Sequence, residues 1–176
     1  MNRQSYYIMS ADTPVAEWSD NKLIVIDDTL LPLFFRRSHN VEDWLASRAI
    51  DHKRPNARLL KKALRLKEKD DVSTAMHVNG ATITDNYWIK SFDSELTYAN
   101  VKFRDDRFAQ LALKGAYDCF VRAASAKNTH TPELTNTGSF EKCWRMIDGR
   151  WWMYNPPIMM RCSRSCSSRD SAWRSV

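Results

Sequence analysis

The chain has 176 residues, of which 43% are hydrophobic and 11% aromatic. This composition supports one domain with a sizeable core and excludes a wholly disordered or fibrous protein. The formal net charge is +6, but four arginines and one aspartate after residue 155 supply half of that excess. The remaining charge is ordinary for a soluble domain, so nucleic-acid binding is not favoured.

Two further classes of protein are not favoured by the hydropathy pattern. No apolar run approaches the ~20 residues that a membrane-spanning helix needs. The first residues, Met1 to Tyr7, lack the apolar region of a signal peptide. We therefore expect a cytoplasmic protein with no membrane partner.

The N-terminal part predicts a small antiparallel sheet. Short apolar runs at residues 6–9, 15–18 and 22–26 have the length and composition of strands, and Asp20-Asn21 is typical of a turn between two of them. The apolar run at residues 30–35 contains a proline, so we expect a buried connector there rather than a central strand.

Three helices are predicted between residues 41 and 79. Ser38 or Asn40 can cap the first, which starts at Val41 and has apolar residues at helical spacing. The second starts near residue 56, and the third runs from residue 71 to about residue 78. Their basic residues also allow a DNA-recognition interpretation, although a solvated helix face is the simpler one.

The C-terminal part predicts a mixture of strands and one further helix. We expect a strand at residues 85–89, a short extended piece at 98–103, a helix from about 105 to 115 and a polar loop at 127–138. A strand at residues 140–147 then precedes Asp148-Gly149, a strong signal for a two-residue hairpin turn, and the return strand spans residues 150–154.

The most informative motif runs from Thr131 to Trp144, with the sequence TPELTNTGSFEKCW, and continues through the hairpin to Tyr154. It resembles the nucleotide-binding start of the HipA-like serine/threonine kinases, in the bacterial branch with a PELTTxG…KCW…DG…YK signature. The upstream stretch DNYWI at residues 85–89 is similar to the NDxYWI stretch of that branch. Together the similar residues cover most of residues 1–154.

The resemblance implies an activity, a cofactor and a partner. The family reaction is phosphoryl transfer from ATP to a protein Ser or Thr, with Mg²⁺. A toxin–antitoxin context and an antitoxin-like protein regulator are also implied. Small polar residues let backbone N–H groups approach a phosphate closely. The candidate nucleotide-binding residues are Thr135, Asn136, Thr137, Gly138, Ser139 and Lys142.

The chain departs from the family after Tyr154. The family has a lysine there that pairs with the phosphates of the nucleotide, whereas this chain has Asn155, which is neutral and too short for the role. Loss of one base from an AAA codon would give Asn155 and the residues that follow, and restoring that base returns a lysine and an amphipathic helix with glutamates. We therefore expect residues 155–176 to be a disordered product of a frameshift. A native Ser/Arg-rich disordered tail is the alternative.

The predicted fold class is α+β, with a small antiparallel sheet, a helical segment and part of a kinase-like small lobe that ends in a β-hairpin. The expected segments are residues 1–82, 83–154 and 155–176. The expected function is that of a truncated HipA-like kinase without a large lobe, inactive in phosphoryl transfer, with no catalytic residue, no metal site and poor or absent ATP binding. The alternative is a non-enzymatic binding or regulatory module that could contact DNA through the helices at 41–79.

Overall fold

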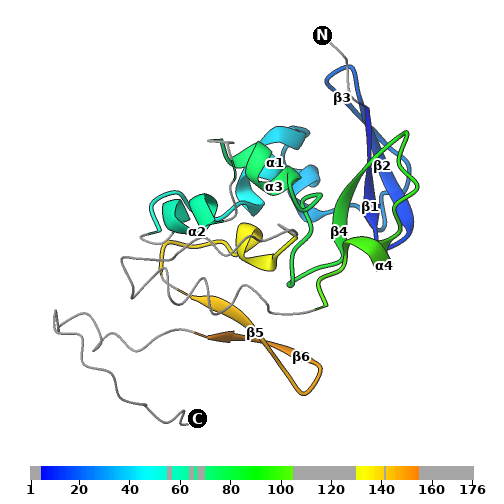
Figure 1. Ribbon diagram of the computed structural model, residues 1–176. Helices are drawn as coiled ribbons and strands as arrows, with labels where there is room; N and C mark the ends of the chain where they lie inside the picture. The colour runs from blue at the N-terminus through cyan, green and yellow to red at the C-terminus, as the bar shows by residue number, and fades with distance from the viewer. Residues whose placement is uncertain are drawn as a thin grey trace, which may run out of the picture.

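The protein has an α+β fold, as the sequence predicts, with an antiparallel sheet, short helices and a separate hairpin (Figure 1). The computed structural model describes residues 5–54, 57–63, 66, 70–104, 130–140 and 142–154. The helix expected at 105–115 and the tail expected at 155–176 lie outside the described residues. None of the described helices is long and apolar enough to cross a membrane.

The sheet contains four antiparallel strands in the order β3-β2-β1-β4. Three of them form the N-terminal meander that the sequence predicts. Strand β4 follows the helices in the chain and pairs along the other side of β1. The sheet therefore includes strands from both sides of the expected boundary after residue 82. The strands are β1 (Tyr6–Ser10), β2 (Thr13–Ser19), β3 (Lys22–Val25) and β4 (Tyr87–Ser91).

Each face of the sheet contributes to its own apolar cluster. Ile8 is paired with both Ala16 and Ile89, and these three buried residues belong to a cluster that includes residues of the helices. Met9 and Trp88 are paired at the next position and point to the opposite face, because strand side chains alternate. The Trp88 indole N–H also donates to the Ala11 carbonyl oxygen at 2.7 Å. The sheet is thus covered on both sides near β1 and β4.

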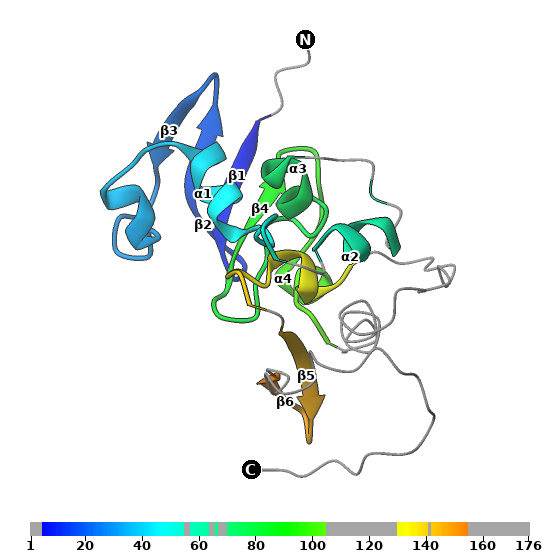
Figure 2. The ribbon, with the colours of Figure 1, turned by 90° about the vertical axis from the view of Figure 1, so that its left-hand side faces the viewer.

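The three helices between residues 41 and 79 are confirmed as α1 (Val41–Arg48), α2 (Ala57–Ala63) and α3 (Asp71–Met76). The side chain of Asn40 caps α1, accepting from the backbone N–H groups of residues 42 and 43 at 2.9 and 3.1 Å. Helices α1 and α3 lie side by side (Figures 1 and 2).

Two local expectations were wrong, and a third, a buried connector rather than a strand at residues 30–35, was met in part. Residues 98–101 form a short helix, α4 (Tyr98–Val101), because the Asn100 side chain accepts from the backbone N–H of Thr97 at 2.9 Å and closes a helical turn. The loop expected at 127–138 contains a 3-10 helix, η2 (Pro132–Thr135), whose four residues are buried. The connector before α1 forms η1 (Leu33–Arg36), in which Leu33 is 75% exposed although Phe35 is buried.

The hairpin after η2 is confirmed. Strands β5 (Cys143–Ile147) and β6 (Arg150–Tyr154) are antiparallel and joined at Asp148-Gly149. Both turn residues have positive φ, 50° and 73°, as a two-residue turn of the primed type requires. Strand β5 starts at Cys143 rather than at residue 140. The hairpin lies apart from the four-stranded sheet (Figures 1 and 2).

Candidate functional site

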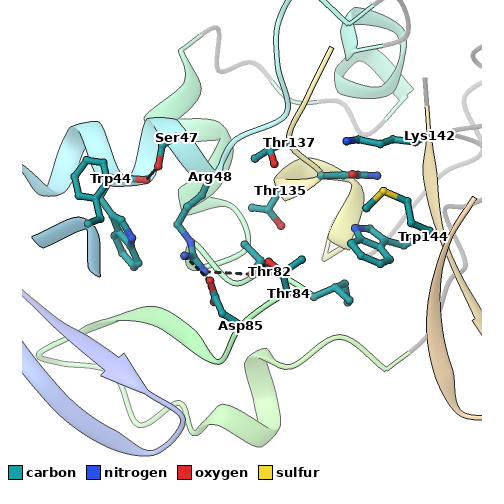
Figure 3. A pocket seen from close by; sticks show the side chains of 14 residues that line it. Trp44, Ser47, Arg48, Thr82, Thr84, Asp85, Thr135, Thr137, Lys142 and Trp144 are labelled. Atoms are coloured by element: carbon teal, nitrogen blue, oxygen red, sulfur yellow. Dashed lines mark hydrogen bonds and ion pairs between the residues drawn. The ribbon is translucent and has the colours of Figure 1, made fainter. Parts of the chain in front are cut away.

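A groove of about 300 Å³ lies where α1, the segment before β4, the end of η2 and the hairpin meet (Figure 3). Four hydroxyl-bearing threonines, one lysine and two tryptophans contribute to its wall, so it offers hydrogen-bond donors beside apolar surface. Its lining residues are Phe34, Trp44, Ser47, Arg48, Thr82, Ile83, Thr84, Asp85, Thr135, Asn136, Thr137, Lys142, Trp144 and Met153.

One wall of the groove is fixed by Arg48, the last residue of α1. Its two terminal nitrogens, Nη1 and Nη2, donate to the two carboxylate oxygens of Asp85 at 3.0 and 2.6 Å. Its Nε donates to the Gly80 carbonyl at 2.6 Å, and Nη2 also donates to the Tyr87 carbonyl at 3.1 Å. The guanidinium lies 4.6 Å from the ring centre of Trp44. Arg48 therefore connects α1 to the chain that enters β4 and is already fully paired.

The opposite wall contains four of the six candidate nucleotide-binding residues, and Gly138 and Ser139 lie outside the lining of the groove. Thr135 and Asn136 are buried, whereas Thr137, Gly138 and Ser139 are exposed. The Thr135 hydroxyl donates to the Ala81 carbonyl at 2.6 Å, so it anchors the loop to the core. In Figure 3, Thr135, Thr137 and Lys142 lie across the groove from Arg48. The exposed residues 137–139 form the part of the loop whose backbone a ligand could reach.

The turn at Gly138 needs a glycine. Its φ of +100° is a conformation that residues with a side chain rarely adopt. A Cβ at this position would lie 2.7 Å from the Lys142 amine Nζ. The lysine amine therefore lies close to the glycine, at the exposed end of the loop. A small turn with a cation beside it is an arrangement suited to an anionic ligand.

A buried polar network stands beneath this loop. Glu133 is 1% exposed, and its Oε1 accepts from the Trp144 backbone N–H at 2.7 Å. Its Oε2 accepts from the Asn136 side-chain amide at 3.1 Å and lies 3.9 Å from Nη2 of Arg54. The Arg54 guanidinium, also 1% exposed, donates through Nη1 to the Asn136 carbonyl at 3.2 Å and through Nη2 to the Lys142 carbonyl. We call Arg54, Glu133 and Asn136 the buried network.

Two groups near the loop have shifted pKa values, mainly because of burial. Burial raises the pKa of Glu133 from its usual 4.5 to about 7, although the N–H donors of Trp144 and Asn136 and the charges of Arg54 and Lys142 act in the opposite direction. Burial and the nearby Arg54 charge lower the pKa of Lys142, and Glu133 partly offsets this. Burial is the largest cause of both shifts, because a charged group loses hydration when it is removed from water.

The structure brings five of the six candidate residues into one short loop, residues 135–139, with Lys142 close beside it. Asn155 lies outside the described residues. Sequence reasoning missed Arg54 and gave Glu133 no role. Glu133 stands within the quoted motif, so a signal existed, whereas nothing near Arg54 in the sequence marks it as buried.

No group of three or more His, Cys, Asp or Glu side chains in the part of the chain that the structure describes is placed to hold a metal ion. Comparison of the chain with known proteins found no matching family model, no matching curated protein and no matching solved structure.

Proposed function

We propose that this chain contains part of the small lobe of a HipA-like protein kinase and that residues 135–139, with Lys142, form its phosphate-binding loop. The family reaction is phosphoryl transfer from ATP to a protein Ser or Thr, with Mg²⁺ held partly by the phosphates. An antitoxin-like protein regulator belongs to the same proposal. The chain of residues 1–176 binds ATP weakly and does not transfer its phosphate.

The observation that carries this proposal is the placement of Lys142 close to Gly138 at the exposed end of the loop. Three features support it together. Gly138 has a positive φ, the Lys142 amine lies 2.7 Å from the point that a Cβ on this glycine would occupy, and a tight hairpin begins one residue after the lysine. A kinase small lobe likewise has a small-residue loop followed by a tight hairpin before a lysine-bearing strand, although the segment before the loop here is the 3-10 helix η2 rather than a strand.

Weak binding follows from the charges that the loop offers. Residues 137–139 are exposed, and their backbone N–H groups and one lysine are the groups proposed to meet a phosphate, but Asn155 stands where the family has its second cation. Without that cation we expect a dissociation constant on the order of 1 mM or weaker. Transfer of the phosphate is not expected, because kinase catalysis depends on positioned charges around the phosphates.

The test is a titration of the 1–176 chain with ATP, followed by line broadening of the ³¹P resonances, which detects weak complexes. Lys142→Met should weaken binding by up to about fivefold, the size of one partly exposed charge contact. Lys102→Met is the matched control, because Lys102 is exposed and lies outside the lining of the groove. Equal binding by the two variants would contradict the assignment of Lys142.

Phosphoryl transfer is tested separately with radiolabelled ATP and a heat-treated control. Labelled phosphate on the protein or on an added substrate protein, above that control, would contradict the expected inactivity. A chain that is inactive but binds ATP at the loop would agree with the proposal. A folded chain in which ATP perturbs no loop residue would contradict the family assignment.

The alternative function is a regulatory module that contacts DNA through α1 to α3. A mobility-shift assay with DNA distinguishes it from the kinase proposal. Two of the arginines in this region, Arg48 and Arg54, are buried and donate to partners inside the protein. We therefore expect little binding, and the binding that remains should fall steeply with salt. Binding through phosphate contacts alone weakens steeply as salt rises. Sequence-selective shifts that persist at about 150 mM salt would therefore favour the DNA-binding alternative over the kinase proposal.

A further inference from the structure

Arg54 joins two points of the chain that the sequence separates from it by more than 80 residues. It lies between α1 and α2 and donates to the backbone carbonyls of Asn136 and Lys142. These carbonyls stand at the two ends of the loop formed by residues 136–142. One buried guanidinium therefore binds both ends of the loop from outside it.

Glu133 also contacts the chain at both ends of this loop. Its carboxylate accepts from the Asn136 side chain at the start of the loop and from the Trp144 backbone N–H after it, at 3.1 and 2.7 Å. It also lies 3.9 Å from the Arg54 guanidinium. The two ends of the loop are thus held by two buried side chains, Arg54 and Glu133, that lie next to each other.

We propose that Arg54 is a positioning residue that holds the two ends of loop 136–142 together and so sets the distance between Gly138 and the Lys142 amine. The inference rests on the proposed function, because it assigns Arg54 to the phosphate-binding loop. It also gives the helical segment a direct connection to that loop. Movement of the chain between α1 and α2 would therefore shift the ends of the proposed phosphate-binding loop.

The reason is that a short loop with exposed central residues has few contacts of its own. Residues 137–140 are exposed, with Phe140 at 82%, so core packing does not fix their path. Their geometry depends on where the chain leaves and re-enters the core. Hydrogen bonds to a charged donor are stronger than neutral ones, and a guanidinium presents its donors in a fixed plane. Arg54 can therefore fix the distance between the two carbonyls better than a neutral donor could.

The experiment compares Arg54→Lys and Arg54→Met with Arg58→Met in the full 1–176 chain. Arg58 is an exposed residue on α2 and serves as the matched control. Lysine keeps the charge of Arg54 but loses its planar pair of donors, so it tests geometry even where the methionine variant fails to fold.

The readout is the ratio of two amide hydrogen-exchange rates. The Trp144 amide bonds to Glu133 beside the loop, whereas the Ile89 amide bonds to the Asn79 carbonyl in the core. Arg54→Lys should speed exchange at Trp144 by about tenfold, the effect of losing one charge-assisted hydrogen bond, and leave Ile89 unchanged. Arg58→Met should change neither rate. Equal acceleration at both amides, or none at Trp144, would overturn the proposal.

Binding of ATP to the same variants separates this inference from the proposed function. If the wild-type chain binds ATP, Arg54→Lys should weaken binding by about fivefold, as the Lys142 amine loses its set position. An unchanged affinity would overturn the positioning role. If the wild-type chain binds no ATP, the proposed function fails, and the exchange ratio alone decides whether Arg54 holds the loop.

Discussion

Replacement of Arg48 by methionine should lower the free energy of unfolding more than the same replacement at an exposed arginine. Arg48 is 7% exposed and connects α1 to the chain that enters β4. Methionine keeps much of the packing of the side chain but removes every donor. The Asp85 carboxylate and two backbone carbonyls, of Gly80 and Tyr87, then lose a charged partner.

The size of the loss follows from burial. Breaking a fully buried ion pair by removing one partner costs about 3–5 kcal/mol. Asp85 is 32% exposed on its side chain, so water compensates part of its charge. We therefore expect a loss of about 2–3 kcal/mol in the free energy of unfolding, or a Tm that is lower by about 4–12 °C for a chain of this size.

The assay is urea unfolding followed by circular dichroism, with a thermal scan beside it. Arg37→Met is the matched control, because Arg37 is exposed on the chain after η1 and should lose less than about 0.5 kcal/mol. Asp85→Asn, combined with Arg48→Met in a double-mutant cycle, isolates the pair itself. A loss for Arg48→Met no larger than that for Arg37→Met would refute the reasoning.

Three further outcomes are expected. Asn40→Ala should cost about 1 kcal/mol in the free energy of unfolding, because it removes the cap of α1, and a loss below about 0.3 kcal/mol in urea unfolding would contradict this role. The raised pKa of Glu133 means that its contribution to stability is full below pH 4.5 and is lost as the pH rises to about 7. The free energy of unfolding should fall on the order of 3 kcal/mol across that window, and Glu133→Gln should flatten its dependence on pH. An unchanged dependence on pH in the variant would show that this carboxyl does not titrate there. Sequencing of the gene at codon 155 should show that one added base restores a lysine and an open frame, whereas an immediate stop would contradict the frameshift.

The elements that the sequence predicted correctly are those that depend on local chemistry. The cap at Asn40 and the turn at Asp148-Gly149 use side chains and backbone angles within four residues of each other. The strand around Ile8 is a short apolar run, which a short window of sequence reveals. Each of these signals is complete within the stretch of chain that carries it.

The features that the sequence did not reveal depend on distant partners. Residues 131–136 look polar, yet they are buried because Arg54, more than 75 residues earlier, neutralises Glu133 and binds the Asn136 carbonyl. The pairing of β4 with β1 and the bond from Arg48 to Asp85 likewise join segments that no local pattern relates. The loop itself could be predicted, but not the buried network that holds it.

The most direct test of the phosphate-binding loop is a two-dimensional ¹H–¹⁵N NMR titration of the labelled 1–176 chain. ATP and inorganic tripolyphosphate should each shift the amide resonances of Thr137, Gly138 and Ser139, and adenosine should not, because the proposed function assigns phosphate binding to this loop. Half-saturation is expected at millimolar concentration or above. Absence of a shift at these amides with either polyphosphate at 20 mM, about twentyfold above a 1 mM constant, would contradict the account.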